Sequence, residues 1–159
     1  MLRGRTSLVA FFYTRCMNPT KCSLTISRMA ILAQHIQTAP APLDLNLVAI
    51  SYDPDFDVPA RLYSFGRDRG FAFTGEARLI RCLTGWRAVQ QAFTLEVGYG
   101  GSTVNEHARE LFVVSPGLQA IGVDCDALSE PIRMLDEIAA QSLRLQVAPT
   151  RNRPPDTNM

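Results

Sequence analysis

The chain carries near its start the run Ser7-Leu8-Val9-Ala10-Phe11-Phe12-Tyr13, which is almost entirely apolar. A short unbroken apolar run is typical of a parallel β-strand that is covered on both faces. After it, a set of residues that a helix would bury recurs with helical spacing: Thr25, Met29, Leu32, Ala33 and Ile36. This periodicity predicts a helix that begins near Cys22. Open α/β sheets bind their ligands at such strand-to-helix junctions, so this junction is the first place to look for a site.

Two cysteines, Cys16 and Cys22, lie at this junction with the spacing C-x5-C. The dipeptide Asn18-Pro19 between them favours a turn that folds the loop back and brings the two sulfurs together. Arg15 and Lys21 flank the pair, and the helix start near Cys22 favours an anion, so thiolate character is expected at neutral pH. A disulfide, or two thiols buried in the core, is the alternative.

The rest of the chain predicts an α/β domain. Leu45 to Tyr52 is a second buried strand, and Ala60 to Arg67 a second helix with Asp57 as its N-cap and Pro59 in its first turn. The later elements are expected in this order: a strand at Phe71–Thr74, a helix over Glu76–Val97 with Trp86 in the core, a loop at Gly98–Ser102, a hairpin of Glu110–Val114 and Leu118–Val123, and a helix over Leu128–Leu145. Residues 148–159 lack any apolar period and are expected to be disordered.

Composition narrows the class of protein. At 159 residues with 47% hydrophobic residues, the chain fits one domain, here residues 1–147. Sixteen basic and fifteen acidic residues give a net charge of +1, which does not suggest binding to nucleic acid or to an anionic membrane. The sequence shows no apolar stretch of transmembrane length and no signal peptide, so no direct membrane insertion is expected.

Several residues together resemble the Sco/SenC family of thioredoxin-like copper proteins that help assemble cytochrome c oxidase. They are Phe11-Phe12-Tyr13-Thr14-Arg15-Cys16, Cys22, Asp53-Pro54, Asp57, Pro59 and His107. The resemblance covers roughly residues 7 to 145 and implies a thioredoxin-like fold, with a central mixed sheet flanked by helices. The family's usual cysteine spacing is C-x3-C, so the C-x5-C spacing of this chain is a departure.

The resemblance also implies a metal site. Cys16, Cys22 and His107 would hold one copper ion per chain, with His107 in a polar loop just before the hairpin. Two thiolates and one imidazole form a soft set of three ligands, which suits copper and is too small for closed structural zinc. Asp53 and Asp57 would orient a ligand without binding the metal; helix capping is their alternative role.

Three functions follow from this interpretation. The first is a metallochaperone that delivers copper to the copper-centre subunit of cytochrome c oxidase, or reduces the cysteines of that centre, in the periplasm or an equivalent oxidising compartment. The second is a thiol-disulfide oxidoreductase that uses the pair Cys16 and Cys22, and the third is a structural relative without chemistry. The other two cysteines are interpreted as structural: Cys82 in the helical pattern and Cys125 in an exposed-looking Asp-Cys-Asp context.

Three other sites are excluded. Asp53, Asp55 and Asp57 resemble the opening of a calcium loop, but the required glycine is replaced by Val58 and a closing glutamate is missing. The peroxiredoxin pattern needs a threonine three residues before the reactive cysteine, and neither cysteine has one. The glycines after residue 97 lack the spacing and the following helix of a dinucleotide fingerprint.

Overall fold

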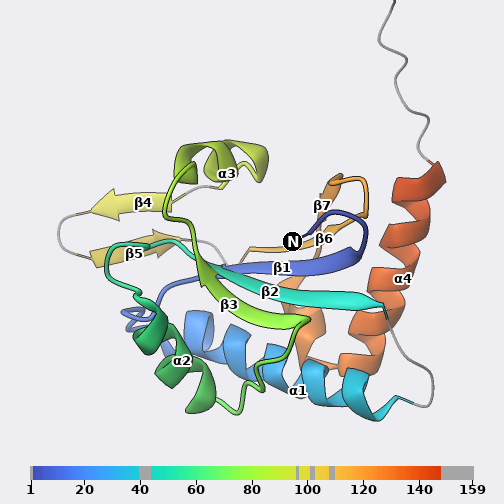
Figure 1. The fold of residues 1–159 in the computed structure, drawn as a ribbon, viewed down its shortest axis with the longest axis horizontal. Helices are drawn as coiled ribbons and strands as arrows, with labels where there is room; N and C mark the ends of the chain where they lie inside the picture. Colours follow the sequence, from blue (N-terminus) through green and yellow to red (C-terminus); the bar gives the residue numbers. More distant parts are fainter. Residues whose placement is uncertain (1, 40–43, 96, 101–102, 108–109, 148–159) are drawn as a thin grey trace, which may run out of the picture.

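The computed structural model describes residues 2–39, 44–95, 97–100, 103–107 and 110–147, without the side chains of 97–107 and 142–147. In this part of the chain, the main sheet contains β1 (Thr6–Phe12), β2 (Leu45–Ser51), β3 (Ala77–Arg81), β6 (Leu111–Val114) and β7 (Ala120–Gly122). The spatial order is β3-β2-β1-β6-β7, with β1, β2 and β3 parallel and the last two strands antiparallel (Figure 1). The sheet is therefore mixed, as the sequence predicts.

Helices cover both faces of this sheet. They are α1 (Leu24–Thr38), α2 (Pro59–Arg67), α3 (Trp86–Ala92) and α4 (Pro131–Val147). In Figure 1, α1 and α2 lie below the sheet and α3 lies above it. Because both faces are covered, every residue of β2 is buried, and β1 is buried from Ser7 onward. Among the described residues, no helix is long and apolar enough to cross a membrane.

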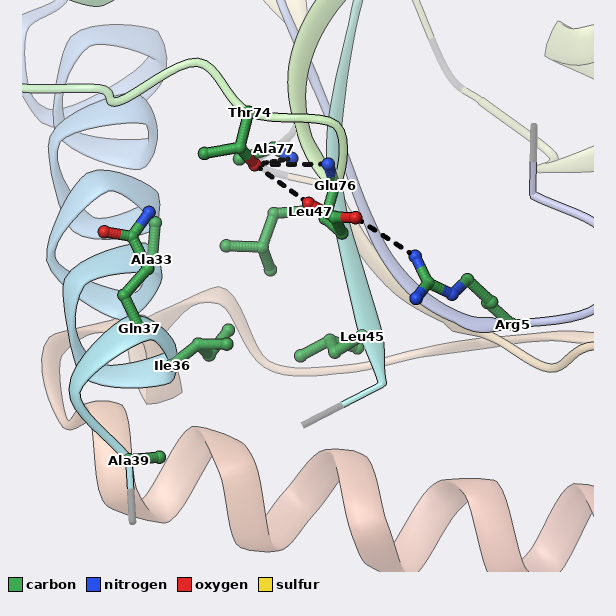
Figure 2. A pocket seen from close by; sticks show the side chains of 10 residues that line it. All are labelled: Arg5, Ala33, Ile36, Gln37, Ala39, Leu45, Leu47, Thr74, Glu76 and Ala77. Atoms are coloured by element: carbon green, nitrogen blue, oxygen red, sulfur yellow. Dashed lines mark hydrogen bonds and ion pairs between the residues drawn. The ribbon is translucent and has the colours of Figure 1, made fainter. Parts of the chain in front are cut away.

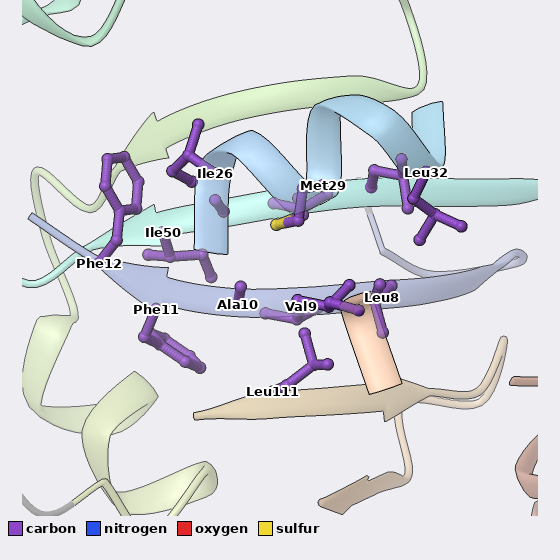
Figure 3. Close-up of a cluster of buried hydrophobic side chains, with 14 of the residues drawn as sticks. Leu8, Val9, Ala10, Phe11, Phe12, Ile26, Met29, Leu32, Ile50 and Leu111 are labelled. Carbon is purple, nitrogen blue, oxygen red and sulfur yellow. The ribbon is translucent and has the colours of Figure 1, made fainter. Parts of the chain in front are cut away.

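The core is built on the alternation of side chains along β1. Figure 3 shows α1 packed over one face of β1 through Ile26, Met29 and Leu32. On the other face, Phe11 makes edge-on ring contacts with Phe93 and Phe112, at centroid distances of 5.1 Å and 6.0 Å. Such aromatic pairs contribute about 0.5–1.5 kcal/mol each beyond the burial of their surface.

The region from residue 71 to residue 97 differs from the expectation. Phe71–Thr74 is not a strand, and Glu76–Val97 is not one helix but the strand β3 followed by the short helix α3. Ala77 and Leu79 are buried whereas Arg78 between them is exposed, which is the alternation of a strand. Pairing with β2 decides the outcome here, because a segment of five residues is too short to distinguish the helical from the strand period. Cys82 accordingly follows a strand.

The structure changes two further expectations, the loop at 98–102 and the start of the last helix. The expected loop at 98–102 includes part of β4 (Val97–Gly100), which pairs antiparallel with β5 (Thr103–His107). The hairpin of β6 and β7 is confirmed, and its turn is closed by the hydrogen bond from the Ser115 N–H to the Gln119 oxygen at 2.8 Å. The last helix is also confirmed, but a 3₁₀ turn at Cys125–Ser129 delays its start to Pro131. The expected tail at 148–159 lies outside the described residues.

Candidate metal centre

Residues 14–22, which we call the thiol loop, connect β1 to α1 and carry both cysteines. The side-chain oxygen of Asn18 accepts hydrogen bonds from the Thr20 N–H at 2.9 Å and from the Thr20 hydroxyl at 2.7 Å. This cap starts a short turn at Pro19, which ends in a kink at Lys21, whose φ of −106° and ψ of −109° are not helical. Cys22 directly follows the kink, two residues before the start of α1; it is 2% exposed, while Cys16 is half-buried.

The turn brings the two thiols together. The Cys16 and Cys22 side chains are hydrogen-bonded to each other, and no disulfide joins them. Cys16 Sγ also lies 3.7 Å from the backbone oxygen of Asn18, to which the thiol donates. The loop is therefore folded back at Asn18, and the C-x5-C spacing allows the two sulfurs to meet.

Cys22 is a thiol rather than a thiolate at neutral pH. Its hydrogen bond with Cys16 and its burial raise the pKa of Cys22 far above the ordinary value of 9.0, and the Tyr13 backbone N–H only partly opposes this rise. Arg15, one of the two cations expected to favour a thiolate, is paired with Asp53 instead. The expectation of a thiolate is therefore wrong for Cys22, and a metal that binds there must displace a proton.

Asp53 fixes the residue next to Cys16. Its carboxylate accepts hydrogen bonds from Arg15 through both Nε, at 3.0 Å, and Nη2. The Arg15 guanidinium lies 4.2 Å from the centroid of the Phe56 ring, a cation–π contact that holds it from a second side. The amino-terminal side of the thiol loop is thus bound to the segment that follows β2.

Asp57 fixes the residue before Arg15. It is fully buried, and its carboxylate accepts hydrogen bonds from the Thr14 N–H at 3.1 Å, from the Thr14 hydroxyl and from the Ser51 hydroxyl. The N-cap of α2 is Val58, which makes no side-chain cap bond. The prediction that Asp57 caps α2 is therefore wrong, because Thr14 of the thiol loop and Ser51 of β2 supply the donors that its oxygens accept from.

His107 is the last residue of β5, opposite Val97 in the register, and not part of a loop. The side chain of His107 is not described, so its inclusion in the ligand set stays a prediction. Among the side chains that are described, no group of three or more His, Cys, Asp and Glu residues is arranged to hold a metal ion. The two thiols are the part of the predicted site that the structure brings together.

Sequence reasoning missed two residues at this end of the sheet. The Tyr52 hydroxyl donates a hydrogen bond to the Glu110 carboxylate, and Tyr52 is 1% exposed. The available signal was a tyrosine at the end of a buried strand, since a buried phenol needs a partner. Elsewhere in the chain, Cys125 is 6% exposed, so the Asp-Cys-Asp context, which suggested an exposed residue, was misleading.

A separate cavity of about 490 Å³ lies at the opposite end of the sheet. Figure 2 shows it between α1 and the amino-terminal ends of β2 and β3, with Ile36 and Leu45 among its apolar lining. At its edge, Arg5 pairs with Glu76 at 3.4 Å. The thiol loop follows the carboxyl end of β1, so this cavity is not part of the thiol site.

Comparison with known proteins relates the chain to one family. The SCO1/SenC family model matches residues 1–142. A search of curated protein sequences gives no match. Many solved structures match. The three described below have low sequence identity to this chain, so they bear on the fold alone.

Three of these structures illustrate the similarity. A SCO1/SenC family lipoprotein from Bacillus anthracis is 19% identical, with a TM-score of 0.71 over 87% of this chain and 82% of its own. Yeast Sco1 with copper bound is 15% identical, with a TM-score of 0.65 over 95% and 85%. BsSco, described with a disulfide switch and as a member of the Sco family of cytochrome c oxidase assembly proteins, is 17% identical, with a TM-score of 0.65 over 89% and 82%. The chain therefore has the thioredoxin-like fold of these proteins.

Proposed function

The chain belongs to the SCO1/SenC family, and on this premise we propose that it binds one copper ion and delivers it to the copper centre of cytochrome c oxidase. Cys16, Cys22 and His107 are the proposed ligands. Copper is the cargo of such a protein, so the site must both bind it and release it. The partner is the oxidase subunit that carries the copper centre.

The contact between Cys16 and Cys22 carries this proposal. Two sulfurs that meet at the end of a buried strand form a soft donor pair, which suits copper better than hard oxygen-preferring cations. Asp53 and Asp57 support the pair indirectly, because they hold the two residues that precede Cys16. Partners of this kind orient metal ligands in many sites, and their loss weakens metal binding.

The relatives add support from a different direction. Yeast Sco1 was solved with copper bound, and BsSco is described as a cytochrome c oxidase assembly protein. The similar chain from Bacillus anthracis is described as a lipoprotein, which supports an extracytoplasmic, membrane-associated location for this protein as well.

A second candidate function is thiol-disulfide exchange, favoured by the unequal exposure of the pair. Cys16 is half-buried and Cys22 is 2% exposed, as expected for an attacking thiol and a resolving thiol. In this reaction the Cys16 thiolate attacks a partner disulfide and Cys22 then releases the partner. The chain gains a disulfide, and the partner gains two thiols, with both electrons and both protons coming from the cysteine pair.

Copper reconstitution tests the first function. Protein loaded under reducing conditions should retain about one equivalent of copper, and either Cys16→Ser or Cys22→Ser should abolish retention, because each removes one of the two soft ligands. Cys82→Ser is the matched control and should retain copper. Retention by both site variants would exclude the assignment.

A second assay separates the two functions. Turnover of a disulfide substrate by copper-free protein would favour the exchange reaction over copper delivery. A protein that neither retains copper nor reduces a disulfide would be a structural relative that keeps the fold without the chemistry.

A further inference from the structure

Tyr52 and Glu110 connect two strand ends that border the thiol loop. Tyr52 follows β2, and its buried hydroxyl donates to the carboxylate of Glu110, which directly precedes β6. The backbone oxygen of Glu110 accepts a second hydrogen bond, from the Phe11 N–H at 3.3 Å. Glu110 is therefore fixed through its side chain and through its backbone, and neither it nor Tyr52 belongs to the proposed ligand set.

The phenol has one well-defined position. The Tyr52 ring packs against Phe11 at 5.7 Å and against Trp86 at 5.9 Å between centroids, and the Tyr52 N–H donates to the Phe12 oxygen at 2.7 Å. Burial, followed by the Glu110 carboxylate, raises the pKa of Tyr52 well above its usual value. The hydroxyl therefore remains a proton donor throughout the neutral range.

Each end of this hydrogen bond is close in sequence to the proposed site. Tyr52 directly precedes Asp53, whose carboxylate binds Arg15 of the thiol loop. Glu110 lies three residues after His107, the last residue of β5. Two side-chain bonds, Arg15 to Asp53 and Tyr52 to Glu110, thus link the thiol loop to the root of the β4–β5 hairpin.

We propose that the Tyr52–Glu110 hydrogen bond is a clasp that positions His107 relative to the two thiols. The inference rests on the copper-binding function proposed above and assigns to Tyr52 and Glu110 the role of positioning residues. A site built from two chain segments needs such a connection, because an unanchored hairpin would place its imidazole over a wide range of distances from the sulfurs.

Removal of the hydroxyl tests the clasp. Tyr52→Phe keeps the packed ring and deletes the donor, so we expect copper affinity to fall about tenfold or more and the thiolate-to-copper absorption of the Cu(II) form to shift. Glu110→Leu should have the same effect. Glu110→Gln keeps an acceptor oxygen, so its copper affinity and its Cu(II) absorption should remain those of the wild-type protein. Tyr63→Phe, at an exposed tyrosine of α2, is the matched control and should change neither.

The His107→Ala background distinguishes positioning from a general structural role. Because the clasp acts through His107, Tyr52→Phe should cause no further loss of copper affinity in that background. A loss of equal size in both backgrounds would mean that the hydrogen bond supports the thiols or the fold, and it would overturn the inference. Unfolding by urea, followed for each variant, identifies the fraction that is folded.

The two proposals fail in different ways. If the wild-type protein binds copper but Tyr52→Phe leaves its affinity and spectrum unchanged, the clasp is wrong and the copper function stands. If the wild-type protein retains no copper, the copper function is wrong and the clasp is overturned with it.

Discussion

The carboxylate of Asp57 accepts hydrogen bonds from both the backbone N–H and the hydroxyl of Thr14, which lies two residues before Cys16. These two residues are 43 positions apart in the chain. The carboxylate also accepts from the Ser51 hydroxyl, so one buried side chain connects the end of β2 to the loop that follows β1. The geometry of the thiol loop therefore depends on a residue that, from its sequence context, looks like a helix cap.

Asp57→Ala should destabilise the protein and weaken copper binding. The substitution leaves the buried Ser51 hydroxyl and two partly buried donors of Thr14 without their acceptor, which we expect to cost about 3 kcal/mol in the free energy of unfolding. Urea unfolding measures this change. Asp55→Ala, at an exposed aspartate of the same segment, is the control and should change stability by less than about 0.5 kcal/mol. Equal effects of the two substitutions would contradict the prediction.

Gly66→Ala should destabilise the contact between α2 and the sheet. A Cβ atom at this position would lie 2.7 Å from Phe73 Cζ and 2.8 Å from Leu79 Cδ1, so side chains must move, at an expected cost of about 1–3 kcal/mol. Gly75→Ala is the matched control, since a Cβ atom there meets nothing within 4 Å. A shift in the urea midpoint confined to the first variant is the expected result.

Stability should fall as the pH rises above about 9. The pKa of Cys22 is raised in the folded protein, so above the ordinary value of 9.0 the unfolded chain loses a proton that the folded chain keeps. The unfolded state then binds fewer protons, and the free energy of unfolding decreases by about 1.4 kcal/mol per pH unit for this group. Urea unfolding between pH 8 and pH 10 should show a smaller decrease in Cys22→Ala. An identical decrease would show that other groups are responsible.

Mild oxidation should produce an intramolecular disulfide between Cys16 and Cys22, because their side chains are already in contact. Closing the wider C-x5-C ring costs only about 0.3 kcal/mol more than closing a C-x3-C ring. The bridge should block copper uptake, and reduction should restore it, since the metal needs both thiolates. Peptide mapping identifies the bridge; a dominant link to Cys82 or Cys125 would contradict the prediction and also weaken both proposed functions.

The sequence was sufficient for the elements whose burial pattern is unambiguous. β1 and β2 are continuous apolar runs, and the Ser115-Pro116-Gly117 turn leaves one arrangement for the strands on either side of it. The region of β3 could not be predicted in the same way. Its five residues fit a strand only because β2 offers a parallel partner, which is information that lies outside the segment.

In the candidate site, too, only some of the residues could be predicted from local sequence. The cysteines were recognisable from their position after a buried strand, and the structure brings them together through the Asn18 cap. The partners of Thr14 and Tyr52 were not recognisable, because each hydrogen bond joins residues far apart in the chain. Local patterns predict which residues a site contains more readily than they predict what holds those residues in place.

The central place of β1 in the sheet also governs when the thiols become protected during synthesis. β1 emerges first, but its neighbours are β2 and β6, and Ser7 pairs with Val114 near the other end of the domain. Contacts between such distant segments form slowly, and β1 keeps an open edge until residue 114 has been made. The cysteines that follow β1 are therefore available to oxidants and stray metals until β6 has been made, and a nascent chain is at greatest risk of a wrong disulfide during that interval.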